Sequence, residues 1–430
     1  MSTLILVLRS LLWVLLGCTG VIFVSLYIRG AFRAPVKYRV KDGPSPAEPR
    51  FSTVLASLST SLMTSGTITQ FWSQPDQIQA ARLAAISAAQ RTIHFETFFM
   101  TPGRRANDFA AALAERASAG VKVQLVIDAY GANTLPKRYW QRLRAAGVGV
   151  VFFNRFDWRA PSNFAGRTHR KLLLIDGQVA LIGGAGISDH WDGDDQTSPW
   201  LDIEVRIEGE IVPVLEGMFI QHWTYSGGEA NLRAETFRAD PVQDKGLMLV
   251  TPGNNPTYRF SPIRALKENT IVAARQRIWL ASPYLIPDRN SRELLIEAKQ
   301  SGVDVRILTS TLGNIDKKYV YYAAYELYGD LLKNGIEIYE YLPNMTHAKM
   351  LLVDDQWVNI GSANFDPRSF FHNEELDLST ADPMLQQSVE QVFETAFAQS
   401  QGMSLKDWQH RSWWRHRLFG GLVRFIQWQL

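Results

Sequence analysis

The sequence predicts an α/β protein made of two repeats related by a pseudo-twofold axis, each a mostly parallel sheet flanked by helices, behind one N-terminal transmembrane helix. Helical stretches alternate with short apolar strands in both halves of the chain. The stretch from His169 to Asp176 recurs from His347 to Asp354. An uncharged apolar run precedes both halves. With 430 residues, the chain can bury one large core or two domains of ordinary size.

The apolar run covers residues 11–28, which are 18 uncharged positions and just enough to cross a bilayer. We therefore assign residues 1–30 to a membrane anchor. Arg9 precedes the run, and a larger basic set follows it: Arg29, Arg33, Lys37, Arg39 and Lys41. Positive charge in excess after the span predicts that the body lies on the cytoplasmic side.

Three alternatives compete with a retained anchor. They are a cleaved signal peptide, a lipoprotein processing site at Cys18, and a buried core helix. No clear cleavage site is present, and the apolar run continues well past Cys18. Cys18 is the only cysteine, so an internal disulfide is excluded. Net charge is +3, from 45 basic and 42 acidic residues, and this value alone argues neither for nor against a nucleic-acid partner.

Residues 31–66 are expected to form a linker, since proline, serine and threonine are frequent from Gly43 to Gly66. The two repeats are placed at residues 67–242 and 243–400. Helical residues 109–119 and the strand-like residues 121–127 are echoed by residues 293–301 and 303–308. A pseudo-twofold pairing of the repeats would bring both motif strands to one cleft. The alternative is two independent domains with separate sites.

Both motif copies read H-x-K-x4-D. Residues i and i+2 of a strand share a face, so His169 lies beside Lys171 and His347 beside Lys349. An imidazole can attack phosphorus or transfer a proton near neutral pH, and an ammonium can hold phosphoryl oxygens. Two copies therefore offer a nucleophile and an acid for one phosphodiester. Asp176 and Asp354 complete the motif as candidate catalytic residues, but their odd offset favours a bracing role at the strand ends.

The doubled motif resembles that of the phospholipase D superfamily and, within it, the bacterial cardiolipin synthases. Further matches are Gly361-Ser362-Ala363-Asn364, Asp366-Pro367-Arg368-Ser369 and Asn373-Glu374-Glu375. The resemblance covers about residues 70–400. It implies a phospholipase D-like fold and a phosphohistidine intermediate, with His169 as nucleophile and His347 as acid and base by analogy. It implies no metal and no cofactor.

Each catalytic imidazole needs a partner that fixes its tautomer. Glu375 matches the residue with this role in relatives, and Asp202 is the nearest first-half match. Asn364, Ser362 and Gly184 are expected to support the site near the substrate phosphate. Glu96 and Asp128 are weaker candidates for supporting residues.

One position departs from the family pattern. The family commonly has asparagine where this chain has Gly186. Either a water or another residue supplies the hydrogen bond of the missing amide, or the first-half site is less active.

Residues 401–430 interleave tryptophan and arginine, as in a segment that lies in an anionic membrane interface. Such a segment could instead dock on the body through its tryptophans. The tyrosines from Tyr319 to Tyr328 follow a helical spacing and indicate core packing or a cleft wall.

The resemblance thus implies a membrane phosphatidyltransferase that joins two phosphatidylglycerols into cardiolipin and releases glycerol. The alternatives are a phospholipase D that uses water or another alcohol, a nuclease of the same superfamily, and a non-catalytic protein that binds anionic lipid. The expected partners are a phospholipid and the membrane, with no nucleic acid.

Overall fold

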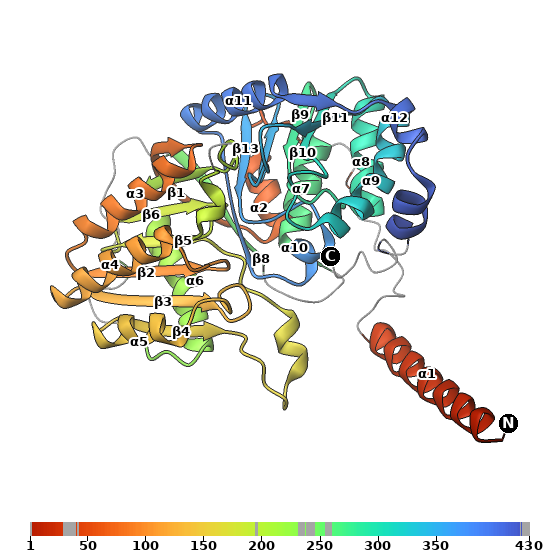
Figure 1. Cartoon of the computed structure of the whole chain (residues 1–430). Helices are drawn as coiled ribbons and strands as arrows, with labels where there is room; N and C mark the ends of the chain where they lie inside the picture. The colour runs from red at the N-terminus through yellow and green to blue at the C-terminus, as the bar shows by residue number, and fades with distance from the viewer. Residues whose placement is uncertain are drawn as a thin grey trace.

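A single mixed sheet of 15 strands runs through both halves of the body (Figure 1). The computed structural model describes residues 2–28, 40, 43–193, 197–230, 237, 246–253, 260–421 and 423. The strand order is β15-β11-β10-β9-β12-β13-β14-β8-β1-β7-β6-β5-β2-β3-β4. On either side of the central β8–β1 pair the same succession of strands follows, apart from the added edge strand β15. The duplication predicted from the sequence is therefore confirmed in the topology.

The strands have the following bounds: β1 (Leu62–Trp72), β2 (Thr92–Thr97), β3 (Lys122–Asp128), β4 (Gly149–Phe153), β5 (Leu172–Ile175), β6 (Val179–Gly183), β7 (Glu204–Glu208), β8 (Gly246–Gly253), β9 (Arg277–Ala281), β10 (Asp304–Ser310), β11 (Glu337–Tyr341), β12 (Met350–Val353), β13 (Trp357–Gly361), β14 (Glu375–Thr380) and β15 (Ser400–Gly402). The helices have these: α1 (Ser2–Ile28), α2 (Phe51–Ser59), α3 (Pro75–Ala88), α4 (Arg104–Ser118), α5 (Lys137–Ala145), η1 (Pro161–Ala165), η2 (Asp189–Trp191), α6 (Ile211–Tyr225), α7 (Pro262–Ala273), α8 (Arg289–Gln300), α9 (Lys318–Lys333), α10 (Pro367–Phe371), α11 (Pro383–Ala398), α12 (Leu405–Gln409) and η3 (Trp413–Gly420).

The expectation of mostly parallel sheets is corrected. Among the strands that the structure describes, parallel pairing is confined to β2-β3-β4 and β9-β10-β11, where helices provide the crossovers. The motif strands β5 and β12 instead form antiparallel hairpins with β6 and β13. A connection as short as residues 176–178 cannot make a parallel crossover, so these strands must run antiparallel.

Helices cover the sheet in two ways. One apolar core of each half lies under its outer helices, α3, α4 and α5 in the first half and α7, α8 and α9 in the second. A third core joins strands of both halves to α6 and α11. In α9, Tyr321, Tyr325 and Tyr328 are buried, which confirms the core-packing interpretation for these three, whereas Tyr319 is exposed.

The predicted linker extends too far. Helix α2 belongs to the body, because Phe51 and Leu55 are buried and the ring of Phe51 meets that of Trp357 edge-on at 5.0 Å. The next strand, β1, pairs with β8 at the centre of the sheet. The first repeat thus begins before residue 67, and the predicted boundary at 243 lies outside the described residues. The composition of residues 43–66 concealed these elements because small polar residues dominate them.

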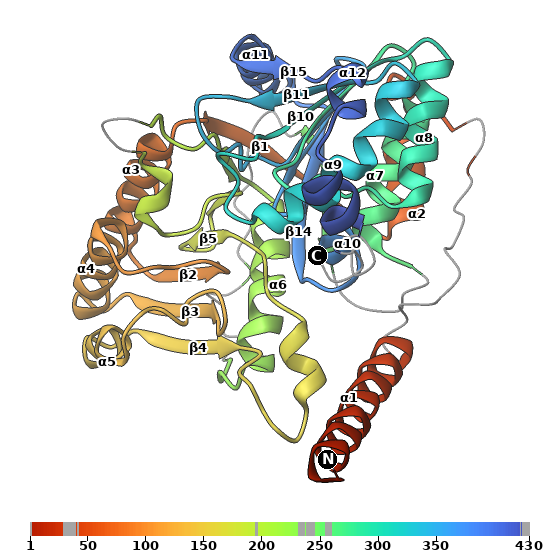
Figure 2. The ribbon, with the colours of Figure 1, turned by 45° about the vertical axis from the view of Figure 1, so that its right-hand side comes forward.

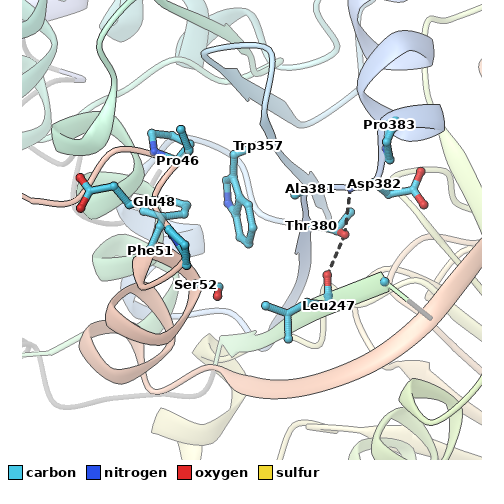
Figure 3. Close-up of a pocket in the computed structure, with 13 residues that line it drawn as sticks. Pro46, Glu48, Phe51, Ser52, Leu247, Trp357, Thr380, Ala381, Asp382 and Pro383 are labelled. Carbon is cyan, nitrogen blue, oxygen red and sulfur yellow. Dashed lines mark hydrogen bonds between the residues drawn. The ribbon is translucent and has the colours of Figure 1, made fainter. Parts of the chain in front are cut away.

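Helix α2 and the end of β14 border a surface pocket of about 540 Å³ (Figure 3). Trp357, Leu247 and Thr380 line it, and the Thr380 hydroxyl donates to the carbonyl of Leu247 at 2.8 Å. Thr380 is the last residue of β14, whereas Glu375 is the first. The pocket is therefore at the end of β14 remote from the motif histidines described below.

Helix α1 lies apart from the body in both views (Figures 1 and 2). It is long and apolar enough to cross a membrane from Ile5 to Val24, and none of that stretch is buried. The candidate span thus starts earlier than predicted and includes Arg9. The five basic residues on which the predicted orientation depends, 29–41, lie outside the described part of the chain.

The C-terminal segment divides into two parts with different surroundings. Trp408 of α12 donates its indole N–H to the carbonyl of Tyr325 at 2.8 Å, and the Arg411 guanidinium stacks on its ring at 3.6 Å. Trp413 and Trp414 in η3 are instead exposed. The ring of His416 in η3 lies 4.7 Å from that of Tyr325, so the docking alternative describes α12 and one face of η3. Residues 422 and 424–430 of the predicted amphipathic segment are outside the described residues.

Candidate active site

The two motif histidines are held in place by backbone pairing between the halves. The N–H of His169 donates to the carbonyl of Glu374 at 2.8 Å, and the N–H of His347 donates to that of Leu201 at 2.6 Å. Strands β5 and β12 begin one residue after Lys171 and Lys349. Each motif strand thus belongs to its own half, while the histidine before it is fixed by the other half.

The carboxylates follow the same crossed arrangement. Nδ1 of His169 lies 2.9 Å from Oε2 of Glu375, and Nδ1 of His347 lies 2.8 Å from Oδ2 of Asp202. Both carboxylates are fully buried. The histidine of the first half is therefore oriented by a carboxylate of the second half, and the histidine of the second half by a carboxylate of the first. The two motif copies form one centre, and the alternative of two separate sites is excluded by this geometry.

Each carboxylate has its own set of donors. The Ser362 hydroxyl donates to Oε2 of Glu375 at 2.5 Å, and the Asn373 amide donates to Oε1 at 3.2 Å. Asp202 instead accepts the indole N–H of Trp191 at 2.9 Å. A Cβ at Gly184 would lie 2.2 Å from Oδ1 of Asp202, so glycine is required for this approach. Ser362 and Gly184 thus position the two carboxylates, and their place near the substrate phosphate stays a prediction.

The motif lysines are buried against the histidines. Nζ of Lys171 donates to the carbonyl of His169 at 2.5 Å, and Nζ of Lys349 lies 3.1 Å from Nε2 of His347. Burial, together with the charge of Lys349, lowers the pKa of Lys171 to about 7. Burial likewise lowers the pKa of Lys349 to about 8. These ammonium groups lack enough counter-charge, and a bound anion would supply it.

Burial and the neighbouring lysines also keep both imidazoles neutral. They lower the pKa of His169 well below its usual range, and His347 itself adds to that effect. Burial and then Lys349 lower the pKa of His347 to about 4. For Asp202, burial raises the pKa, but the interaction with His347, including its hydrogen bond, and the charge of Lys349 outweigh burial, and the net shift is downward. Since Nδ1–H of each neutral ring donates to a carboxylate, the lone pair of each ring is on Nε2, and that of His347 faces the Lys349 ammonium at 3.1 Å.

The motif aspartates are not part of this centre, so their inclusion among the catalytic residues is corrected. Asp176 accepts backbone N–H groups of residues 90–92 at 2.7–2.9 Å. Asp354 accepts those of residues 275–277 at 2.7–3.0 Å. Both lie at the end of the motif strand opposite the histidine. They bind the start of β2 and of β9, which is the bracing role that their odd offset favoured.

Comparisons with known proteins match this geometry. The family model described as "Cardiolipin synthase, PLD-like domain" matches residues 83–191 and 268–397, more than half of the chain. The chain belongs to the cardiolipin synthase family of phospholipase D-like proteins. The first matched segment contains His169 and Lys171, and the second contains His347, Lys349 and Glu375.

Individual relatives agree with this assignment. The chain is 35% identical over 303 residues to "Cardiolipin synthase" of Geobacillus thermodenitrificans, covering 69% of this chain and 60% of the relative. It is 32% identical over 347 residues to "Cardiolipin synthase A" of Pseudomonas syringae pv. syringae, covering 80% of this chain and 71% of that protein. The chain thus spans about 60% of the length of several of the curated relatives that it matches.

The fold also matches a solved structure. Phosphatidylserine synthase of Haemophilus influenzae superimposes with a TM-score of 0.65 at 13% identity, over 88% of this chain and 99% of that one. At this identity the similarity shows the fold alone. It confirms the phospholipase D-like architecture predicted from the doubled motif.

The unusual Gly186 of this family member has a structural explanation. A Cβ at this position would lie 2.6 Å from the carbonyl oxygen of Phe99 and 3.3 Å from the ring of Trp191. The backbone of Phe99 and the indole of Trp191 thus occupy the space of an asparagine side chain. In the second half, Asn364 is retained, and its buried Oδ1 has no hydrogen-bond partner among the described residues.

Sequence reasoning missed the aromatic walls of the site. The ring of Phe98 lies 5.2 Å from that of His169, and the rings of Trp191 and Trp200 lie 5.1 and 5.9 Å from that of His347. Phe98 directly follows β2, which pairs with the motif strand β5. This place at the carboxyl end of a neighbouring strand is the one signal in the sequence that could have assigned Phe98 to the site. No periodicity in the sequence marks Trp191 or Trp200.

The weaker candidates Glu96 and Asp128 support the segment before His169. Glu96 accepts the Thr168 hydroxyl and lies 2.6 Å from Nδ1 of His222. Asp128 accepts the N–H of Thr168 at 3.0 Å and pairs with Arg167 at 3.3 Å. Both carboxylates therefore position the segment of residues 167 and 168, and neither is hydrogen-bonded to the ring of His169.

Proposed function

We propose that the chain is a membrane-bound phosphatidyltransferase that joins two phosphatidylglycerols into cardiolipin and releases glycerol. The observation that carries the proposal is the crossed pair of histidines and carboxylates around two buried lysines. In this proposal one substrate phosphate binds between the two lysines, with an imidazole on each side of it. The substrate is taken from the names of the relatives, which are cardiolipin synthases.

In the first step, Nε2 of His169 attacks the phosphorus of a donor phosphatidylglycerol. The bond from phosphorus to the glycerol oxygen breaks, and His347 delivers a proton from Nε2 to that oxygen. A phosphatidyl group remains on His169 and glycerol leaves. Lys171 and Lys349 neutralise the charge that develops on the phosphoryl oxygens. The bound phosphodiester anion raises the pKa of His347, so the imidazole can carry that proton.

In the second step, His347 removes the proton from a hydroxyl of a second phosphatidylglycerol. The oxygen attacks phosphorus, and the bond from phosphorus to Nε2 of His169 breaks. Cardiolipin forms and both imidazoles return to their starting states. Asp202 and Glu375 hold the Nδ1–H tautomer of their histidines through both steps. His169 takes the nucleophilic role by the usual order in the family.

The test uses the full chain in detergent with phosphatidylglycerol as the only lipid. We expect cardiolipin and glycerol in equal amounts, and a loss of about a thousandfold or more in turnover for His169→Ala and for His347→Ala. His410→Ala, which removes an exposed histidine at the end of α12, is the matched control and should keep full turnover. Phosphatidic acid as the main lipid product would show a hydrolase instead. Full activity in both site variants would refute the enzyme proposal itself.

A further inference from the structure

An exposed loop carries aromatic side chains beside the site. Residues 154–166, here called the aromatic loop, connect β4 to the segment that holds His169. Phe156 and Trp158 are 67% and 75% exposed. Trp158 is the most exposed large apolar side chain that the structure describes outside α1. Two exposed aromatic side chains this close together on one short loop are typical of a surface that contacts an apolar partner.

The base of the loop is rigid, so its tip has a defined position. Nδ2 of Asn154 donates to the carbonyl of Gly166 at 2.7 Å and closes the loop. The hydroxyl of Tyr225 donates to Oδ1 of Asn154 at 2.9 Å, and the guanidinium of Arg167 donates to the Asn154 carbonyl at 2.9 Å. The loop projects from the sheet in both views, below β4 (Figures 1 and 2).

The loop is also joined to the reacting groups. The guanidinium of Arg167 lies 4.4 Å from the ring centre of Phe164, and Arg167 is two residues from His169. From the second half, Nη2 of Arg368 donates to the carbonyl of Ala165 at 3.0 Å. The ring of Phe156 at the tip lies 5.8 Å from that of Phe164. An aromatic path therefore leads from the tip to the loop base beside the active site.

Cations flank the exposed aromatics. The guanidinium of Arg155 lies 4.3 Å from the ring centre of Phe152, and that of Arg159 lies 5.3 Å from the ring centre of Trp158. Asp157 lies between the two aromatic residues, and its carboxylate accepts the backbone N–H of Arg159 at 2.9 Å. The tip thus presents two apolar rings, and its two arginines exceed its one carboxylate. Tryptophan is suited to the boundary between headgroups and acyl chains, and arginine to lipid phosphates.

We infer that the aromatic loop enters the interface of an anionic lipid bilayer, with Phe156 and Trp158 among the acyl chains and Arg155 and Arg159 at the phosphates. This contact brings the entrance of the active site against the membrane, so a lipid headgroup reaches the histidines while its acyl chains stay in the bilayer. The inference goes beyond the proposed function, because the contact can be measured without any turnover.

The direct test measures the depth of the loop in a bilayer. A Trp158→Cys chain in a Cys18→Ser background is labelled with a fluorophore and placed in vesicles that contain phosphatidylglycerol. We expect a quencher attached to lipid to reduce the fluorescence severalfold more than it does for a label at Ser118→Cys. Ser118 is the exposed last residue of α4, before β3, and lies at the opposite end of the parallel strands from the loop. Equal exposure of both labels to a water-soluble quencher would overturn the inference.

A second measurement separates membrane contact from chemistry. A Phe156→Ser, Trp158→Ser chain should lose roughly five- to tenfold of its turnover on vesicles and keep its turnover on short-chain lipid dissolved below the micelle concentration. Both side chains are exposed, so the variant should fold. Equal loss on both substrates would assign the loop to the active site and contradict the inference. If the unaltered chain turns over neither lipid, the proposed function fails, whereas the quenching result still decides the position of the loop.

Discussion

Each imidazole in the site depends on a carboxylate from the other half of the chain. Glu375 accepts from His169 and Asp202 from His347, so neither motif histidine is paired with a carboxylate of its own repeat. The residue types were predictable from the sequence, because a histidine with a chemical role needs an oriented tautomer. Which carboxylate serves which histidine was not predictable, because that depends on how the two repeats meet.

The crossed pairs give the two carboxylates different kinetic roles. With a phosphatidyl ester of p-nitrophenol, the leaving group needs no proton, so only the nucleophile is required for the first step. Asp202→Asn should therefore release a burst of nitrophenolate and then turn over slowly, since His347 no longer activates the acceptor. Glu375→Gln should show no burst, because it disturbs His169. Transfer by each should fall by about 10²–10³-fold.

Stopped-flow absorbance measures both phases, and Glu115→Gln, on an exposed carboxylate of α4, is the matched control. The reverse pattern, a burst in Glu375→Gln alone, would assign the nucleophile to His347. A burst in both variants would contradict separate roles for the two carboxylates.

The buried lysines predict the alkaline limb of the pH profile. Burial lowers the pKa of Lys171 to about 7 and that of Lys349 to about 8. A lowered lysine pKa means that the positive charge is present below these values and is lost as the pH rises through them. The phosphodiester stays anionic throughout this range, so its attraction to the site weakens. We expect kcat/KM to fall between about pH 7 and pH 9, whereas a flat profile would show that at least one ammonium group stays charged.

At the scale of elements, the motif strands were the most predictable part of the fold. Four apolar residues follow each H-x-K, and they form β5 and β12 as expected. The direction of pairing was not predictable from the same residues, since an apolar run fits a parallel or an antiparallel neighbour equally well. Strand β1 was missed because threonine and serine in residues 62–72 are equally common in linkers.

The turn after β6 provides a test of local packing. Gly186→Ala places a Cβ 2.6 Å from the carbonyl oxygen of Phe99, and this backbone atom cannot move aside cheaply. We expect a loss of about 1–3 kcal/mol in stability and, for a body of this size, a fall of about 1–4 °C in Tm. Gly402→Ala on β15 meets no atom within 4 Å and should leave Tm unchanged. Equal Tm values for both variants in a thermal melt would show that the turn adjusts without cost.

At the scale of the whole molecule, the duplication predicted a pseudo-twofold arrangement, and the continuous sheet realises it through the β8–β1 pair. The pairing of His169 with Glu374 and of His347 with Leu201 then places both histidines at the junction of the halves. Aromatic residues such as Trp191 could not be assigned in advance, because they reach the site only through that junction.

The orientation of the molecule in the membrane is the last prediction. The candidate span from Ile5 to Val24 has the basic residues 29–41 after it, so the body should lie on the cytoplasmic side. In intact cells, a membrane-impermeant maleimide should leave a Ser118→Cys chain unlabelled, and in inside-out vesicles it should label that chain. Cys18 lies within the span, so the chain without the new cysteine should stay unlabelled in both preparations and is the control.

Labelling of Ser118→Cys in intact cells would place the body outside. Because the aromatic loop and the active site belong to that same body, both would then face the outer leaflet, and the lipid donor and acceptor would have to come from there.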